Sequence, residues 1–237
     1  MTVTNAPDAS LETESGPPWA AFVQAIEAEL NAHRDRALTA APDESAFATP
    51  AQPPAPWPQA RVIEWLSFQT YYEYQAMRFI SKWLQTTPET DVMVLLCQQI
   101  ADEANHFNWL NQHLEALGGS LAQWQPLPEM VAWVETYYGS LPNTIARLAA
   151  HNLAGESGAC RSFTSILPFL PPPLQKTMQR IMPDEQFHLR LGRNLLKQHC
   201  VTAEQQAQAR HYALETVALE ACAIQAFNRK LAAIAPD

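Results

Sequence analysis

Apolar residues recur at helical spacing along most of the chain. Between Trp19 and Ala37 they return every three or four residues, which is typical of an amphipathic helix. The same pattern predicts long helices over residues 59–85, 88–118, 142–167, 174–198 and 202–234, and a short helical piece around 130–138. Because no stretch alternates apolar and polar residues as a strand would, we expect an all-α protein.

Proline positions divide this pattern into parts. Most of the 19 prolines lie before residue 60 or in short junctions, where they separate helices rather than interrupt them. We expect residues 1–17 to be disordered, 18–58 to form the amphipathic helix and a proline-rich linker over 41–58, and 59–237 to form one helical domain. The N-terminal helix is then an appendage that docks on this domain.

Local signals set the order of helices within the domain. Thr87 and Pro88 are expected to be the N-cap and first-turn proline of the second domain helix, which ends at Gly118. So short a joint makes the first two helices antiparallel. A longer connection over 118–140 then leads to the third helix, and a proline-rich corner at 168–173 leads to the fourth. This order predicts a four-helix bundle with one long crossover.

Charge and composition narrow the classes of function. Hydrophobic residues make up 47% of the chain, and the net charge is −9 without a basic cluster, so nucleic acid is a poor partner. The four cysteines form no Cys-x-x-Cys pair, which excludes a zinc ribbon and fits reduced thiols. No apolar run has membrane length and no signal peptide is recognisable. We therefore expect a cytoplasmic protein that does not bind membranes.

Two segments on predicted helices share one pattern. They are Asp102-Glu103-Ala104-Asn105-His106 and Asp184-Glu185-Gln186-Phe187-His188. In each, a Glu and a His three residues apart lie on one face of a helix, where both can bind the same transition metal. A single Glu-x-x-His is a weak signal, but two copies in corresponding helices predict a metal site.

The third helix offers one further carboxylate. Between Glu135 and Asp184 the only acid is Glu156, which lies in an otherwise neutral, Ala- and Leu-rich helix. Burying it without a partner would cost several kcal/mol, so it needs a cation.

The first domain helix offers two carboxylates, Glu64 and Glu73. Glu73 lies 30 residues before Glu103, which matches the 29 residues between Glu156 and Glu185, whereas Glu64 lies 39 before it. Glu73 is also about as far before the turn at Thr87 as Glu103 is after it. We therefore expect Glu73 to be the ligand.

The complete set resembles that of the ferritin-like di-iron carboxylate proteins. It comprises Glu73, Glu103, His106, Glu156, Glu185 and His188. The resemblance covers roughly residues 59–200 and implies a ferritin-like four-helix bundle with an additional helix at each terminus. It also implies that Asp102 and Asp184 each hydrogen-bond the histidine of the opposite motif.

The resemblance also implies chemistry. Four carboxylates and two imidazoles would bind two Fe ions (with Mn/Fe as an alternative), use O2 as co-substrate and take electrons from a ferredoxin or reductase. The layout is closest to aldehyde-deformylating oxygenase and the tRNA-hydroxylating group. We expect an oxidase or oxygenase for a small, largely apolar substrate. The substrate, the reaction type and the oligomeric state, with a homodimer as one option, stay open.

Other functions compete with this expectation. The main rival is a ferroxidase or iron store of the bacterioferritin type, and tRNA hydroxylation is disfavoured because it needs a basic face. Rubrerythrins carry paired cysteines that are absent here. Ribonucleotide reductase small subunits carry a radical Tyr at the position that Leu110 occupies.

Neighbours of the ligands predict an apolar substrate pocket, although each also fits a plain bundle core. They are Thr70, Met77, Phe107, Cys160, Phe163 and Phe187. Pro183 predicts a kink beside Glu185, which either allows movement or is a structural bend. Gly155 and Gly158 allow either close helix packing or access to Glu156. His113 and His151 do not repeat the ligand spacing and are expected to be structural or to line the pocket.

Overall fold

A computed structural model describes residues 15–39 and 55–234 of the chain. The elements are α1 (Trp19–Thr39), α2 (Gln59–Leu84), α3 (Thr90–Ala116), α4 (Pro128–Met130), η2 (Val131–Tyr137), α5 (Tyr138–Ser140), α6 (Thr144–Arg147), η3 (Leu148–Gly155), α7 (Glu156–Ile166), η4 (Leu167–Phe169), α8 (Pro172–His199) and α9 (Ala203–Ala232). The described residues are thus helical, as predicted. The expected disorder before residue 15 and the linker over 41–54 lie outside the described residues.

Helices α2 and α3 form the predicted antiparallel pair. Gly118 ends α3 with a φ of 84°, and the amide of Gly119 donates to the carbonyl of Leu114. The start of α3 differs from the prediction, because the Thr87 hydroxyl donates to the carbonyl of Trp83 at 2.9 Å. Thr87 therefore closes the end of α2, and Glu89 occupies the N-cap position of α3.

The third helix runs through α6, η3 and α7, and its middle is the most enclosed part of the fold. Asn143 caps its start by accepting a hydrogen bond from the amide of Ala146. All eight residues of η3, a π-helical segment, are buried. It packs against both α8 and α9. A helix that is apolar all round needs neighbours on every side.

This enclosure corrects the expected role of the C-terminal helix. We expected α9 to be an addition to a four-helix bundle, but it buries one side of η3 and is part of the core. Its start is fixed by a capping box in which Thr202 and Gln205 exchange side chain–backbone hydrogen bonds. Ala209 and Ala213 are fully buried, and such small side chains allow close approach of α9 to its neighbours.

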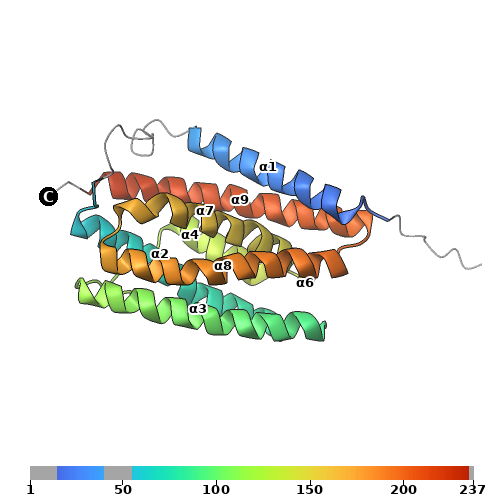
Figure 1. Ribbon diagram of the computed structural model, residues 1–237, viewed down its shortest axis with the longest axis horizontal. Coiled ribbons are helices and arrows are strands. Elements are labelled where there is room, and N and C mark those ends of the chain that lie inside the picture. Colours follow the sequence, from blue (N-terminus) through green and yellow to red (C-terminus); the bar gives the residue numbers. More distant parts are fainter. Residues whose placement is uncertain (1–14, 40–54, 235–237) are drawn as a thin grey trace, which may run out of the picture.

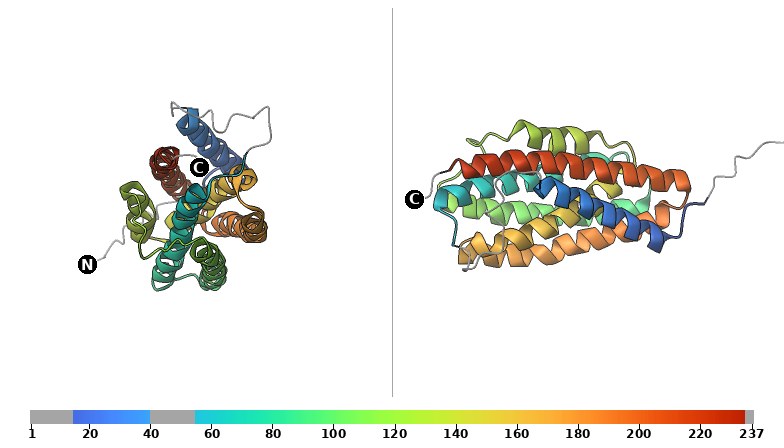
Figure 2. Two further views of the ribbon diagram at one scale, coloured as in Figure 1. Left: turned by 90° about the vertical axis from the view of Figure 1, so that its left-hand side faces the viewer. Right: turned by 90° about the horizontal axis from the view of Figure 1, so that it is seen from above.

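Helix α1 lies along α9 on the side of the molecule opposite α3 (Figures 1 and 2). Its buried face is the predicted apolar stripe, including Phe22, Ile26 and Leu30. One turn further on, the buried Arg34 donates two hydrogen bonds to Glu220 of α9. This ion pair anchors the N-terminal helix on the domain.

Helix α8 continues on both sides of Pro183, which is exposed and removes one backbone hydrogen bond. Gly192 lies further along, where an added Cβ would lie 2.5 Å from Cβ of Asn152 in η3. The two helices are therefore in close contact beside the ligand motif. Among the described residues, no helix is long and apolar enough to cross a membrane.

Candidate metal centre

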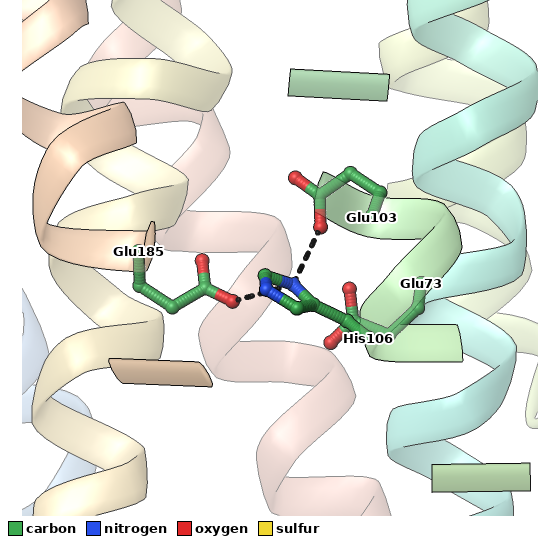
Figure 3. A group of neighbouring side chains, drawn as sticks. All are labelled: Glu73, Glu103, His106 and Glu185. Atoms are coloured by element: carbon green, nitrogen blue, oxygen red, sulfur yellow. Dashed lines mark hydrogen bonds and ion pairs between the residues drawn. The ribbon is translucent and has the colours of Figure 1, made fainter. Parts of the chain in front are cut away.

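Six acidic and histidine side chains meet inside the helices. Ligand atoms of Glu73, Glu103, His106 and Glu185 all lie within 4.8 Å of one another, and so do those of Glu156, Glu185 and His188. The groups come from α2, α3, α7 and α8, and the first group is drawn in Figure 3. Glu185 is common to both groups. The structure thus brings together all six side chains selected from the sequence.

Each motif histidine points one nitrogen into this cluster and the other away from it. Nδ1 of His106 lies 3.1 Å from Oε2 of Glu103 and 3.3 Å from Oε1 of Glu185. Its Nε2 lies 3.3 Å from Oδ2 of Asp184. Likewise, Nε2 of His188 lies 3.2 Å from Oδ2 of Asp102. The structure therefore contains the crossed Asp–His contacts that the resemblance implied, and they direct both Nδ1 atoms inward.

Burial makes the cluster electrostatically costly without cations. The four glutamates are at most 3% exposed. Burial, together with the charges of Glu103 and Glu185, raises the pKa of Glu73, and burial with the charge of Glu185 raises the pKa of Glu156. In the metal-free protein these two carboxyl groups therefore tend to hold protons.

The carboxylates also raise the pKa of the two motif histidines, although burial of an imidazole acts in the opposite direction. Burial alone would lower the pKa of His106, but the hydrogen bond with Glu103 and the charge of Glu185 raise it to about 11. For His188, contacts with Asp102 and Glu103 outweigh burial and raise the pKa to about 10. In the absence of metal, protons thus supply the positive charge that the carboxylates need.

A divalent cation fits the donor set better than protons do. Nδ1 of His188 is buried without a hydrogen-bond partner. Oxygens of Glu103, Glu156 and Glu185 lie 3.5, 3.6 and 3.7 Å from it. A buried ring nitrogen surrounded by carboxylate oxygens, all slightly beyond hydrogen-bond distance, is suited to metal coordination once it is deprotonated. The four carboxylates also balance the charge of two divalent ions.

Two buried glutamines support the carboxylates and were missed in the sequence. Nε2 of Gln69 donates to Oε1 of Glu73 at 2.7 Å. Nε2 of Gln99 donates to Glu156 at 2.7 Å and to Glu103 at 3.2 Å. Both glutamines precede a ligand by four residues, so a repeated Gln-x-x-x-Glu was the available signal.

The two histidines left open by the sequence lie in different places. His113 is half-buried, and its Nε2 lies 2.8 Å from the hydroxyl of Thr177. His151 is fully buried, with Nε2 at 3.2 Å from Oε1 of Glu156. Burial lowers the pKa of His151 to about 4, partly offset by the charge of Glu103. His151 therefore borders the cluster as a neutral imidazole.

Glu64, the alternative carboxylate on α2, and most of the predicted pocket residues lie outside the cluster. Glu64 lies away from the cluster and contacts Nε1 of Trp124 and Nζ of Lys230. Thr70 is fully buried. Four of the predicted pocket residues are half-buried and do not line the cavity described below: Met77, Phe107, Cys160 and Phe187.

A small cavity of about 40 Å³ lies beside the cluster, between α2, the third helix and α9. Its lining includes Gln69 and Tyr72, which precede Glu73 on α2, and Gly155, which precedes Glu156. Phe163 lines it as well, and it is the one predicted pocket residue that does so. An added Cβ on Gly158 would lie 2.1 Å from Oε1 of Glu220, so close helix packing accounts for this glycine.

Comparisons with known proteins identify the fold. One similar structure is a domain of unknown function with a haem oxygenase-like fold from Shewanella denitrificans OS217, with 14% identity, a TM-score of 0.67, and 88% of this chain and 92% of that chain covered. Another is a TenA homologue from Pyrococcus furiosus, with 16% identity, a TM-score of 0.67, and 87% and 98% covered. The chain therefore has a haem oxygenase-like helical fold. No family model matches the chain, and no curated protein matches its sequence.

The expected membership of the ferritin-like family was therefore wrong. It rested on ligand types and spacing, and one constellation of ligands can occur on unrelated folds. The structure shows the physical difference, because α9 encloses the third helix, whereas the predicted bundle would form its core from the four ligand helices alone. The case for a metal site therefore rests on the geometry of these side chains and not on the fold.

Proposed function

We propose that the protein is an O2-activating non-haem oxidase or oxygenase with a two-metal centre, acting on a small, largely apolar organic substrate. The observation that carries the proposal is the burial of four carboxylates and two imidazoles around two overlapping ligand groups. Two Fe ions, or one Mn and one Fe, suit this mixed oxygen and nitrogen donor set. When bound, they would supply the reduction of O2 and the oxidation of the substrate.

The protein's own residues would hold and orient this centre. Glu185 belongs to both ligand groups, so it would help to hold the ion at either position. In the metal-bound protein, Asp102 and Asp184 would keep the remaining proton of each histidine on Nε2, so that the Nδ1 lone pair is available to the metal. Gln69 and Gln99 hold individual carboxylate oxygens and limit the orientations that the glutamates adopt.

The cavity beside the centre supports a small substrate. Its apolar lining includes Phe68, Trp133, Phe163 and Ile224. At about 40 Å³ it has room for O2 or a short apolar group, and it is far below the roughly 300–1,000 Å³ of pockets for drug-sized ligands. A haem macrocycle does not fit there, although the fold is named for a haem enzyme.

Oxygen consumption tests this proposal. Protein loaded anaerobically with Fe(II) is mixed with O2, and the O2 consumed is measured at increasing Fe(II). We expect consumption to saturate at two Fe(II) per chain and to be lost in Glu156→Ala. Glu64→Ala is the matched control, because Glu64 is a half-buried acid on α2 outside the cluster, and it should behave as the wild type.

Two results would count against the proposal. Absence of O2 consumption by the iron-loaded wild type would refute it. Oxidation that continues to tens of Fe(II) per chain would identify an iron store instead. The second result would be compatible with the proposed metal ligands but would contradict the proposed oxidation of an organic substrate.

A further inference from the structure

His151 shares the construction of the two motif histidines. It is fully buried, and one of its ring nitrogens lies within 4.8 Å of ligand oxygens of both Glu103 and Glu156. Its Nε2 lies 3.2 Å from Oε1 of Glu156. The other ring nitrogen, Nδ1, lies 3.5 Å from the hydroxyl of Tyr72. In the same way, His106 and His188 direct one nitrogen to the carboxylates and the other to an outer oxygen. Such an outer oxygen fixes the tautomer of a metal-binding imidazole.

The backbone explains how His151 reaches the same side as Glu156. Five residues of an α-helix turn through about 500°, which would place the two side chains roughly 140° apart around the axis. Residues 148–155 instead form a π-helix, whose hydrogen bonds join residues five apart. The amide of Glu156 donates to the carbonyl of His151. Glu156 therefore follows His151 by about one π-helical turn, and both side chains face the cluster.

Gly155 makes room for this arrangement. A Cβ at this position would lie 2.8 Å from the hydroxyl of Tyr138, 3.4 Å from Nδ1 of His151 and 3.5 Å from the hydroxyl of Tyr72. A larger residue would thus push the imidazole or the tyrosines away. The position of the ring depends on a glycine immediately before the ligand Glu156.

The Gln99 amide marks a position where positive charge is needed. Its Nε2 lies 2.7 Å from Oε1 of Glu156, 3.2 Å from Oε1 of Glu103 and 3.0 Å from Nε2 of His151. An amide nitrogen has two hydrogens, so it cannot serve three acceptors at once. The side chain cannot turn over freely, because its oxygen accepts a hydrogen bond from Asn152. At least one of the three atoms is therefore left for a proton or a cation.

We propose that His151 is a seventh ligand of the centre, binding through Nε2 a metal ion held by Glu103 and Glu156. Nδ1 of His188 faces the same two carboxylates. The inference rests on the two-metal site of the proposed function. It makes the two positions unequal, because one ion has the single imidazole of His106 and the other has two imidazoles. The ion bound by His151 is therefore the one whose affinity depends on the π-helical segment.

A crystal structure of the wild type loaded with Mn(II), with the ions located by anomalous diffraction, tests the inference without any substitution. We expect one ion at about 2.0–2.3 Å from Nε2 of His151, near the usual metal–imidazole distance. An Nε2 more than about 3 Å from every ion would overturn the proposal.

Anaerobic Fe(II) titration of His151→Ala and His151→Gln provides a test in solution. We expect one of the two ions to bind at least about 10-fold more weakly in both variants, with the other unchanged. His113→Ala is the matched control, because His113 also lies on a ligand-bearing helix but contacts Thr177, and it should keep both affinities. Tyr72→Phe, which removes the outer oxygen, should weaken the same ion by a smaller factor.

Unfolding of the metal-free variants separates coordination from a structural role. A merely structural role would lower the stability of the metal-free protein and leave both affinities in the folded protein unchanged, which would overturn the proposal. If the wild type binds no metal, the proposed function fails together with this inference. If wild type and His151→Ala bind two ions equally well, this inference alone fails.

Discussion

At the scale of single residues, the centre depends on which nitrogen of each imidazole carries the proton. Nε2 of His106 faces Asp184 and Nε2 of His188 faces Asp102, so both rings are held from outside the cluster. Each aspartate comes from the motif opposite to the histidine that it contacts. Helices α3 and α8 are therefore linked twice at the level of the ligands.

Removing one of these outer carboxylates should weaken metal binding without removing a ligand. In Asp184→Ala, the ring of His106 loses the acceptor that selects its tautomer, so we expect about 10- to 100-fold lower affinity for one ion. Metal titration measures this change. Asp91→Ala is the control, because Asp91 contacts His199 at an exposed position. Equal affinities in the two variants would show that the outer contacts do not matter.

Metal affinity should also depend on pH. The carboxylates raise the pKa of His106 to about 11 and that of His188 to about 10 in the metal-free protein, so both rings are protonated at neutral pH. A metal ion needs the unprotonated nitrogen, so binding releases protons, and affinity rises as the pH increases from 6 to 8. Calorimetric titration in buffers of different ionisation enthalpy measures the protons released. Affinity without pH dependence would contradict these protonation states.

The meeting of the six side chains was predictable because regular α-helices convert sequence spacing into direction. Glu103 and His106 lie three residues apart, and so do Glu185 and His188, so their shared faces follow from helical geometry. His151 could not be found in this way, because its alignment with Glu156 depends on a π-helix. Nothing in single-residue spacing shows where a helix changes its hydrogen-bonding pattern.

At the scale of elements, the third helix is held by close contact with α8. An added Cβ on Gly192 would lie 2.5 Å from Cβ and 2.9 Å from the backbone carbon of Asn152. Because the backbone of η3 is packed on several sides, it cannot move away freely. This contact connects the motif helix α8 with the helix that carries Glu156.

We therefore expect Gly192→Ala to destabilise the protein by about 1–3 kcal/mol, as overpacking does in other cores. Gly139→Ala is the control, since a Cβ there meets nothing nearer than Nζ of Lys82 at 3.9 Å. Replacing a helical glycine with room for a methyl group should leave stability unchanged or raise it. Denaturant unfolding of the metal-free proteins compares the two, and equal midpoints would contradict the close packing.

The existence and order of the long helices followed from the apolar period and from proline and glycine positions. The junction at Thr87 was mispredicted, because its hydroxyl contacts the preceding helix and Arg147 instead of capping the next one. Side chains of Ser and Thr can serve either helix end, and tertiary partners decide between them. The enclosed middle of the third helix had a visible signal, since residues 148–155 contain no charged side chain.

At the scale of the whole molecule, the ligand pattern did not determine how the helices pack. The predicted four-helix bundle would leave one side of the third helix exposed, but η3 has no polar side suited to water, and α9 covers it. Helix α1 then packs on α9 through Phe22, Ile26 and Leu30. The packing of the helices depends on how many faces of each helix must be buried. The identity of the cluster residues gives no information on this.

One buried ion pair contributes to the attachment of α1 to the domain. Nη2 of Arg34 lies 3.0 Å from Oε2 of Glu220, and the two side chains are 8% and 12% exposed. Arg34→Ala leaves a nearly buried carboxylate unpaired, so we expect a loss of about 3–5 kcal/mol in the free energy of unfolding. Arg161→Ala is the control, because its pair with Asp35 is exposed and should contribute less than about 1 kcal/mol. Thermal unfolding measures both losses. Similar losses of stability in Arg34→Ala and Arg161→Ala would contradict a special role of the buried ion pair.

The central claim is that buried carboxylates and imidazoles on four helices hold two metal ions. The most direct measurement is the amount of metal bound by protein loaded anaerobically with Fe(II) and freed of excess, in the wild type and in Glu156→Ala. We predict two ions per wild-type chain and fewer in the variant, because Glu156 is the carboxylate that the third helix contributes. No bound iron in the wild type, or the same amount in both proteins, would contradict the claim.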